Sequence, residues 1–309
     1  MKAALARSVL LKLVSGLLVA WGSATVAFLA LHALPGEVQD ILAGDLDYPG
    51  LSEAIAAEWG LDRSLAWQYW NFVSNIFSGN LGTSYTLRQP VSEVLFSQLA
   101  PTVLLAGTAG VLAFVLALAV ALGTSGAGRL GRGCAELLER FSVSVPVFWL
   151  GLLLLMALSF GLNWFPVSGG DGWRSLVLPA ITLALPTAGL LSQVLREALD
   201  KALEQPFVVT LRARGLSEGG IRLRHVLRHA VAPAMTLGGW LIGGLLGGAV
   251  LTEKVFGRPG LGTVTLNAVL THDVPIVLAV VLLAAFVHVV ASTALDILYL
   301  FIDPRLRTQ

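Results

Sequence analysis

The chain has 309 residues, of which 56% are hydrophobic and 13% are charged, against about 25% charged in a soluble globular domain. This composition excludes water as the main solvent and predicts an integral membrane protein. The net charge of +1 provides no basic excess that would indicate a nucleic-acid partner. The single cysteine, Cys134, excludes an internal disulfide framework and a cysteine-rich metal site.

Six apolar stretches predict an all-α membrane protein with six transmembrane helices. A helix needs about 20 residues to cross a hydrocarbon core of roughly 30 Å. Each stretch meets this length without an internal Asp, Glu, Lys or Arg: residues 13–31, 103–122, 141–160, 175–195, 231–252 and 274–295. The first is too long for the apolar part of a signal peptide, so we expect an uncleaved span. The fourth contains Pro179, Pro186 and several polar residues, and we expect it to face a lined cavity.

The basic residues predict the orientation of these spans, because Lys and Arg are retained on the cytoplasmic side of short loops. With the N-terminus inside, fifteen of the twenty Lys and Arg residues fall on the inner side. The five on the outer side are Arg63, Arg88, Arg174, Lys254 and Arg258. We therefore expect a multi-pass protein with both termini in the cytoplasm.

The division that we expect is an N-terminal span over residues 1–34, an outer segment over 35–99 and a five-helix core over 100–309. The outer segment is acidic and contains apolar residues at helical spacing between residues 65 and 77, after possible caps at Asp62 and Ser64. Gly79 and Gly82 then end this helix. Short amphipathic helices could cap the outer mouth of the bundle, or Trp59, Trp67, Tyr69 and Trp70 could simply anchor at the membrane interface.

The inner segment at about residues 196–230 predicts a helix, a turn and a second helix. Pro206 breaks the first helix, Gly215 is suited to the C′ position after the next helical stretch, and Ser217 can cap the second helix. A basic inner loop serves as a topology signal by itself. Ordered helical segments that carry apolar residues in such a loop need a partner surface, and this favours docking.

Several other patterns are assigned no chemistry. GAGRLG at 126–131 fits a dinucleotide-binding pattern but lies between two spans instead of after a strand, and the sequence contains no Walker A motif. His225 and His229 lack a third ligand, so we expect structural histidines. His288 lies in the middle of the last span, where a neutral imidazole bonded within the bundle is favoured over a functional group. We predict no catalytic residue and no metal site.

Short motifs occur in one order along essentially the whole chain: HALPGE at 32–37, GNLGTS at 79–84, VPVFW at 145–149, TLRARGLS at 210–217, TEKVF at 252–256 with PGLG at 259–262, and DPRLR at 303–307. In this order they resemble the permease subunits of ATP-binding-cassette (ABC) importers for dipeptides, oligopeptides and nickel. The resemblance implies the type I ABC importer permease fold. Glu37, Val38, Leu211 and His229 depart from the family pattern, and the large Leu211 suggests a matching pocket on the partner ATPase.

The resemblance also implies partners: a second homologous permease, two ABC ATPase subunits that bind ATP and Mg, an extracytoplasmic binding protein, and the lipid of a bacterial inner membrane. This chain itself would bind no cofactor. The inner segment would engage the ATPase, with Phe207, Val208 and Leu211 filling an apolar groove and Arg212 and Arg214 meeting acidic rims. The coupling residues implied are Glu204, Phe207, Val208, Thr210, Leu211, Arg212, Ala213, Arg214, Gly215 and Leu216.

Two further sets of residues have expected roles. The outer hairpin before the last span would form an outer gate at Glu253, Phe256, Pro259 and Gly260. The translocation path or the seam between permeases is expected at Gln193, Gly239, Gly243, Gly247 and His288. Glycines at four-residue spacing let helices approach closely, and packing within the chain explains them equally well.

Three classes of function remain in competition. The leading expectation is an importer permease, and the alternatives are an autonomous channel or secondary carrier and an intramembrane enzyme. A carrier would show charged groups or an inverted repeat within its spans, and an enzyme would need paired catalytic groups at membrane depth. The short outer segment at 161–174 resembles nickel or metal-chelate importers more than dipeptide importers.

Overall fold

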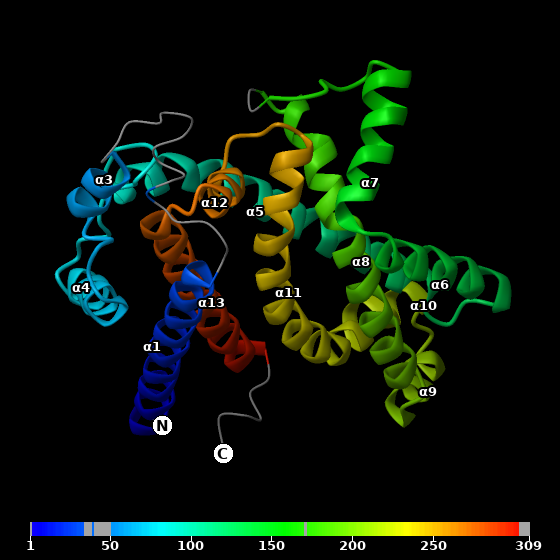
Figure 1. Ribbon diagram of the computed structural model, residues 1–309. Coiled ribbons are helices and arrows are strands. Elements are labelled where there is room, and N and C mark those ends of the chain that lie inside the picture. Colours follow the sequence, from blue (N-terminus) through cyan, green and yellow to red (C-terminus); the bar gives the residue numbers. More distant parts are fainter. Residues whose placement is uncertain (1, 34–38, 40–50, 170–171, 303–309) are drawn as a thin grey trace. The chain divides into compact units, whose positions relative to one another are not determined.

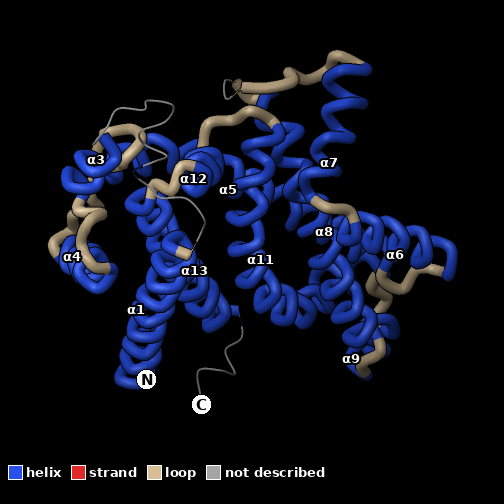
Figure 2. Tube along the Cα trace, in the orientation of Figure 1, coloured by secondary structure: helices blue, strands red, loops and turns tan. Residues whose placement is uncertain are grey.

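The computed structural model describes residues 2–33, 39, 51–169 and 172–302. Within these residues the chain is helical (Figure 1), with one isolated bridge between Thr83 and Pro90. The loops between the helices are mostly short (Figure 2). The predicted all-α fold is therefore confirmed, while the motif ends at residues 34–38 and 303–307 lie outside the described residues.

The chain divides into two compact units. Unit 1 comprises Met1–Leu5, Val103–Arg258 and Val290–Gln309, and unit 2 comprises Ala6–Thr102 and Pro259–Val289. Three helices continue from one unit into the other: α1 (Lys2–His32), α5 (Val91–Thr124) and α13 (Val274–Ile302).

Three helices are long and apolar enough to cross a membrane, within α5, α8 (Arg174–Leu203) and α13. Two bent pairs raise the number to five if each pair forms one span. The described apolar part of α1, Val14–Ala30, is shorter than these helices. A membrane protein is confirmed by this pattern, and the number of six spans stays a prediction.

The third predicted span is not one straight helix. Residues 141–160 contain the end of α6 (Arg129–Ser144), then α7 (Val147–Leu154) and most of the π-helix η1 (Leu155–Gly161). The bend between α6 and the helix that follows it is 105° (Figure 1). The bend falls at Pro146, because proline lacks a backbone donor and holds the preceding Val145 in an extended conformation, φ −84° and ψ 127°. The apolar sequence at residues 141–160 did not indicate this break between two helices.

Unit 1 is built around α8. Its inner half packs in an apolar cluster with α11 (Leu227–Val255) through Leu195, Leu199 and Ala230. Further along, Gly248 of α11 lies so close to α8 that an added Cβ would sit 2.8 Å from Leu183 Cδ2. This glycine therefore serves packing within the chain, whereas Gly247 meets nothing within 4 Å.

Unit 2 holds α3 (Leu51–Trp59) and α4 (Leu65–Phe77), which are expected on the outer side, together with α12 (Leu261–Leu270) and most of α13. The predicted cap is confirmed, since Ser64 accepts a hydrogen bond from the backbone of Trp67. Asp273 is fully buried and accepts hydrogen bonds from the Ser84 hydroxyl at 2.6 Å and the Thr86 hydroxyl at 2.7 Å. This carboxylate fastens the loop before α5 to the start of α13.

Candidate functional site

The inner segment forms a helical hairpin that is anchored in its own unit. After α8 ends at the C-cap Glu204, Pro206 takes the first position of α9 (Pro206–Ala213), where a missing backbone donor costs nothing. Val208 is completely buried. It packs in one cluster with Leu199 of α8 and Ile221 of the π-helix η2 (Ile221–Val226). Apolar burial thus fixes α9 against the inner end of α8.

The turn after α9 is a Schellman motif at Gly215, as the sequence predicts. Gly215 has φ +79°, the left-handed conformation that glycine adopts without strain. Its N–H donates to the Arg212 carbonyl at 2.9 Å, and the Leu216 N–H donates to the Leu211 carbonyl at 3.3 Å. Ser217 then caps α10 (Glu218–Gly220) by accepting from the Gly220 N–H. Backbone hydrogen bonds therefore define the turn completely.

The exposed face of α9 differs from the expected one. Val208 points into the chain's own core, so the expectation that it fills a partner's groove is wrong, and Phe207 and Leu211 are half-buried. Val209, the residue after Val208, is instead 65% exposed. The sequence places two valines side by side, and helical spacing alone does not distinguish which one faces the core.

An ion pair spans the turn. Arg212 donates from Nε to Glu218 Oε1 at 2.7 Å and from Nη2 to Oε2 at 3.2 Å, and this contact lowers the pKa of Glu218. Arg212 thus forms an ion pair within the hairpin while its side chain stays 48% exposed, and its expected contact with a partner stays a prediction. Arg214 is exposed and forms no ion pair with another described residue, so it remains available for a partner's carboxylate.

A basic hollow lies between α9 and the start of α11. It has a volume of about 350 Å³. Phe207 forms one wall and contacts His229, with the two rings tilted by 43° and their centroids 5.2 Å apart. The residues that line it are Phe207, Thr210, Leu211, Arg214, His225, Arg228 and His229. Among the described residues no group of three or more His, Cys, Asp or Glu side chains could hold a metal.

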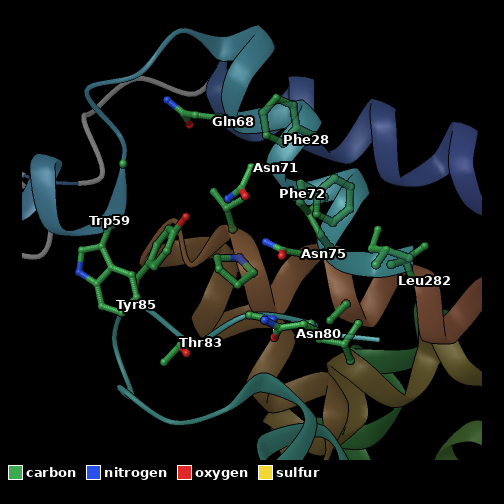
Figure 3. A pocket seen from close by; sticks show the side chains of 18 of the residues that line it. Phe28, Trp59, Gln68, Asn71, Phe72, Asn75, Asn80, Thr83, Tyr85 and Leu282 are labelled. Carbon is green, nitrogen blue, oxygen red and sulfur yellow. The ribbon is translucent and has the colours of Figure 1, made fainter. Parts of the chain in front are cut away.

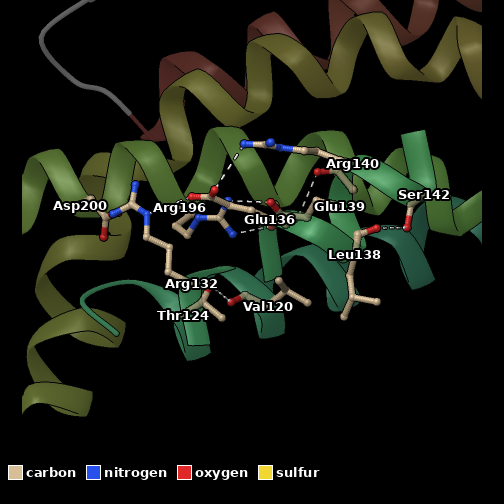
Figure 4. A network of polar contacts seen from close by, with 12 residues as sticks. Val120, Thr124, Arg132, Glu136, Leu138, Glu139, Arg140, Ser142, Arg196 and Asp200 are labelled. Atoms are coloured by element: carbon tan, nitrogen blue, oxygen red, sulfur yellow. Dashed lines mark hydrogen bonds and ion pairs between the residues drawn. The ribbon is translucent and has the colours of Figure 1, made fainter. Parts of the chain in front are cut away.

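A buried ion pair joins α6 to α8 just before the hairpin, and the sequence did not reveal it. Arg196 donates to both carboxylate oxygens of Glu139 at 2.6 Å, and the Ser192 hydroxyl donates to Glu139 at 2.8 Å (Figure 4). Glu139 and Arg196 are 3% and 5% exposed. One turn further along α8, Asp200 forms an ion pair with Arg132 of α6, with 3.1 Å between Arg132 Nη1 and Asp200 Oδ2. Charged contacts thus fix α6 along the part of α8 that leads into α9.

The four outer-gate residues fall in both units. In unit 1, Glu253 is fully buried and Phe256 packs with Leu155 and Leu178. In unit 2, Pro259 is exposed and Gly260 is buried, directly before α12. A gate role for these residues stays a prediction.

The residues expected along the path or seam are also spread over several elements. Gln193 on α8 and both Gly239 and Gly243 on α11 are half-buried, whereas Gly247 on α11 and His288 on α13 are exposed on this chain. Exposure of Gly247 and His288 leaves room for a second subunit, and their role stays a prediction.

Comparison with solved structures defines the fold. The chain matches an amino-acid ABC transporter with a TM-score of 0.51 over 67% of this chain and 93% of that one, at 15% identity. It also matches the MetNI methionine ABC transporter in an inward-facing conformation, with a TM-score of 0.50 over 66% of this chain and 97% of that one, at 18% identity. The fold is that of an ABC transporter permease.

The sequence identifies the family. Residues 113–308 match the model of the binding-protein-dependent transport system inner membrane component, and residues 5–106 match its N-terminal companion. The chain belongs to this family and is a membrane-spanning permease subunit of an ABC importer. This membership favours the transport subunit over a channel, a carrier or an enzyme.

Curated relatives match over nearly their full length. The chain is 33% identical over 289 residues to the glutathione transport system permease protein GsiC of Salmonella typhimurium strain LT2, covering 92% of this chain and 93% of that one. It is 32% identical over 283 residues to GsiC of Escherichia coli K12, covering 91% and 92%.

Proposed function

We propose that this permease serves an importer of short peptides of the glutathione type. The observation that carries the proposal is the 33% identity to a glutathione permease over 92% of the chain. In binding-protein-dependent importers the binding protein selects much of the substrate. The permease therefore only has to let a class of substrates pass. Glutathione is the substrate in the names of the curated relatives, and it is itself a short peptide.

The hairpin at residues 204–216 is proposed to engage the ATPase. Three features support this role: Val208 anchors α9 inside the unit, the Schellman turn fixes its end, and Val209 and Arg214 remain exposed. A stiff element with an exposed apolar residue and an exposed cation transmits force to and from an acidic, apolar surface. Closure of the ATPase would then move α8 through α9, and the helices would rock between outward-open and inward-open states.

The proposed assembly contains this chain, a second homologous permease, two ATPases that bind ATP and Mg, and a binding protein on the outer side. Both termini would lie in the cytoplasm, as the distribution of basic residues predicts. In this orientation the hairpin at residues 204–216 would lie on the side of the ATPase, and the outer helices α3 and α4 on the side of the binding protein.

Nickel or a metal chelate is the second candidate substrate, favoured by the short outer segment at residues 161–174. Both candidates are tested in proteoliposomes that contain the complete complex with its cognate binding protein. We expect ATP-dependent uptake of labelled glutathione or another short peptide. Uptake of radioactive nickel without any peptide uptake would contradict the proposal.

A further inference from the structure

Unit 2 contains a cavity of about 200 Å³ between α4 and the start of α13 (Figure 3). It is smaller than the roughly 300–1,000 Å³ of pockets that enclose a drug-sized molecule. The cavity therefore has room to hold part of a ligand and not to surround it. One side is formed by α4 with Asn71, Phe72 and Asn75, and another by Trp59 and Tyr85.

Two carboxamides at the cavity have no partner within the described part of the chain. The side chains of Asn71 and Asn75 form no hydrogen bond with another described residue, although both line the cavity. The other carboxamides there are occupied. Gln68 donates to the carbonyls of Leu61 and Arg63 at 3.1 and 2.9 Å, and Asn80 accepts from the Gly82 N–H at 2.9 Å. Asn71 and Asn75 thus offer donors and acceptors to a ligand.

The spacing of these two side chains matches a repeat of an extended peptide. Residues i and i+4 of a helix have Cβ atoms about 5–6 Å apart, and every second residue of an extended chain repeats after roughly 6.6 Å. A carboxamide provides both a donor and an acceptor, as does a backbone peptide group. Each asparagine therefore fits one peptide unit, and the fit does not depend on the ligand's side chains.

The remaining walls are mostly apolar or aromatic, with Thr83 as a further polar residue. The rings of Trp59 and Tyr85 lie 5.0 Å apart, and Phe72 and Leu278 add apolar surface. Among the described residues that line the cavity, none is an Asp, Glu, Lys, Arg or His. Burial, with a contribution from Asp273, raises the pKa of Tyr85 to about 12, so its phenol is neutral at physiological pH. The described lining therefore has no group that would select a charged terminus or a metal ion.

We propose that this cavity binds the backbone of a short extended peptide, gripped by Asn71 and Asn75 with a side chain against the Trp59–Tyr85 pair. The inference rests on the proposed function, which supplies a peptide substrate, and it deepens that function by naming a binding site outside the bundle core. It follows that a peptide with blocked ends binds as well as a free one.

The test measures binding, not transport. The permease is assembled with its partner permease and ATPases in nanodiscs, without binding protein or ATP, and titrated with N-acetyl-Gly-Leu-Gly-amide by calorimetry or saturation-transfer NMR. We expect binding by the native complex and a loss of roughly tenfold or more in the double variant N71L/N75L, because hydrogen bonds to both carboxamides disappear. Asn71→Asp, which keeps the shape and removes the donor, should also weaken binding.

Asn267→Leu is the matched control, since Asn267 is exposed on α12 in the same unit and lies outside the cavity. Its affinity for the blocked peptide should be unchanged. Absence of binding by the native complex, or equal affinity in N71L/N75L, overturns the inference. A second titration, with the binding protein added, supplies another contrary outcome: if N71L/N75L binds the blocked peptide normally and loses only docking of the binding protein, the cavity holds a protein loop.

The outcomes separate this inference from the proposed function. Peptide uptake by a complex whose cavity does not bind the blocked peptide overturns the inference alone. Nickel uptake by a complex whose cavity still binds the blocked peptide overturns the proposed substrate class alone.

Discussion

Two short helices of this permease, α9 in the inner hairpin and α4 in the outer segment, have different surroundings. Helix α9 has eight residues and buries Val208 completely, and the turn after it satisfies its polar groups internally. Helix α4 has thirteen residues, none of them buried, and presents two carboxamides beside a cavity. The comparison agrees with the two proposed roles, in which the packed α9 transmits force and the open α4 binds a ligand.

The largest effect on stability is expected at the buried ion pair between Glu139 and Arg196. Arg196→Met leaves Glu139 buried without its partner and should lower the free energy of unfolding by about 3–5 kcal/mol. The double variant E139L/R196M should recover most of this loss, because no unpaired charge remains. Chemical denaturation of the purified permease measures both.

Glu197→Gln is the control for the buried pair. Glu197 also pairs with a cation on α8, Lys201, but the two side chains are 68% and 72% exposed. Removing an exposed pair should leave the free energy of unfolding close to that of the native permease, because solvent screens the two charges. If R196M is as stable as E197Q, the buried pair does not brace α6 against α8.

A smaller effect is expected at the base of the outer segment. Asp273→Leu removes the acceptor for the Ser84 and Thr86 hydroxyls, and the buried Ser84 hydroxyl then keeps only the hydrogen bond that it accepts from the Leu87 N–H. The loss of this acceptor should cost about 1–3 kcal/mol. Amide hydrogen exchange across residues 82–90 should become faster, while exchange in the inner hairpin stays unchanged. Asp62→Leu, at an exposed site, serves as the control. Unchanged exchange in the Asp273 variant would show that this carboxylate does not hold the outer segment.

At the turn of the inner hairpin the expected cost is smaller still. Gly215→Val forces a β-branched residue into φ +79° at a cost of about 1–2 kcal/mol, although nothing lies within 4 Å of an added Cβ. The turn should open, so ATP hydrolysis should continue while peptide uptake falls. Gly219→Val, in α10 and equally free of neighbours, should leave the ratio of uptake to hydrolysis intact. A normal ratio of peptide uptake to ATP hydrolysis in G215V would argue against a rigid hairpin that transmits force.

The smallest effect concerns pH. Arg212 lowers the pKa of Glu218, so the ion pair stabilises the folded turn above the ordinary glutamate pKa and this contribution is lost as pH falls through the lowered value. Hydrogen exchange at residues 215–221 should therefore accelerate in acid more than exchange in α8 does. Glu218→Gln should remove this pH dependence, and persistence of it in the variant would assign the effect to another group.

The sequence predicted backbone features of these regions better than side-chain burial. Ser64 and Gly215 occupy the cap positions that their residue types favour, because capping depends on local chemistry. Val208 and Val209 are neighbours of one type, and only the packing of α9 against α8 and η2 determines that the first is buried. The sequence alone therefore does not predict which of the two valines is buried.

The buried ion pair was missed for a related reason. Glu139 and Arg196 are 57 positions apart and both flank predicted spans, where charges are ordinary. The available signal was Pro146, which predicts a break after α6 and would have separated this charged helix from the apolar one after it. The partner of Glu139 still depended on how α6 lies along α8.

Transmission of force by α9 requires contact with the ATPase, and site-specific photocrosslinking in the assembled complex measures this contact most directly. A photoreactive residue at Val209, exposed on α9, should form a product with the ATPase, while the same residue at Leu251, exposed near the other end of α11, should not. A complex in which Val209 gives no ATPase product, while the ATPase remains bound, would contradict the account.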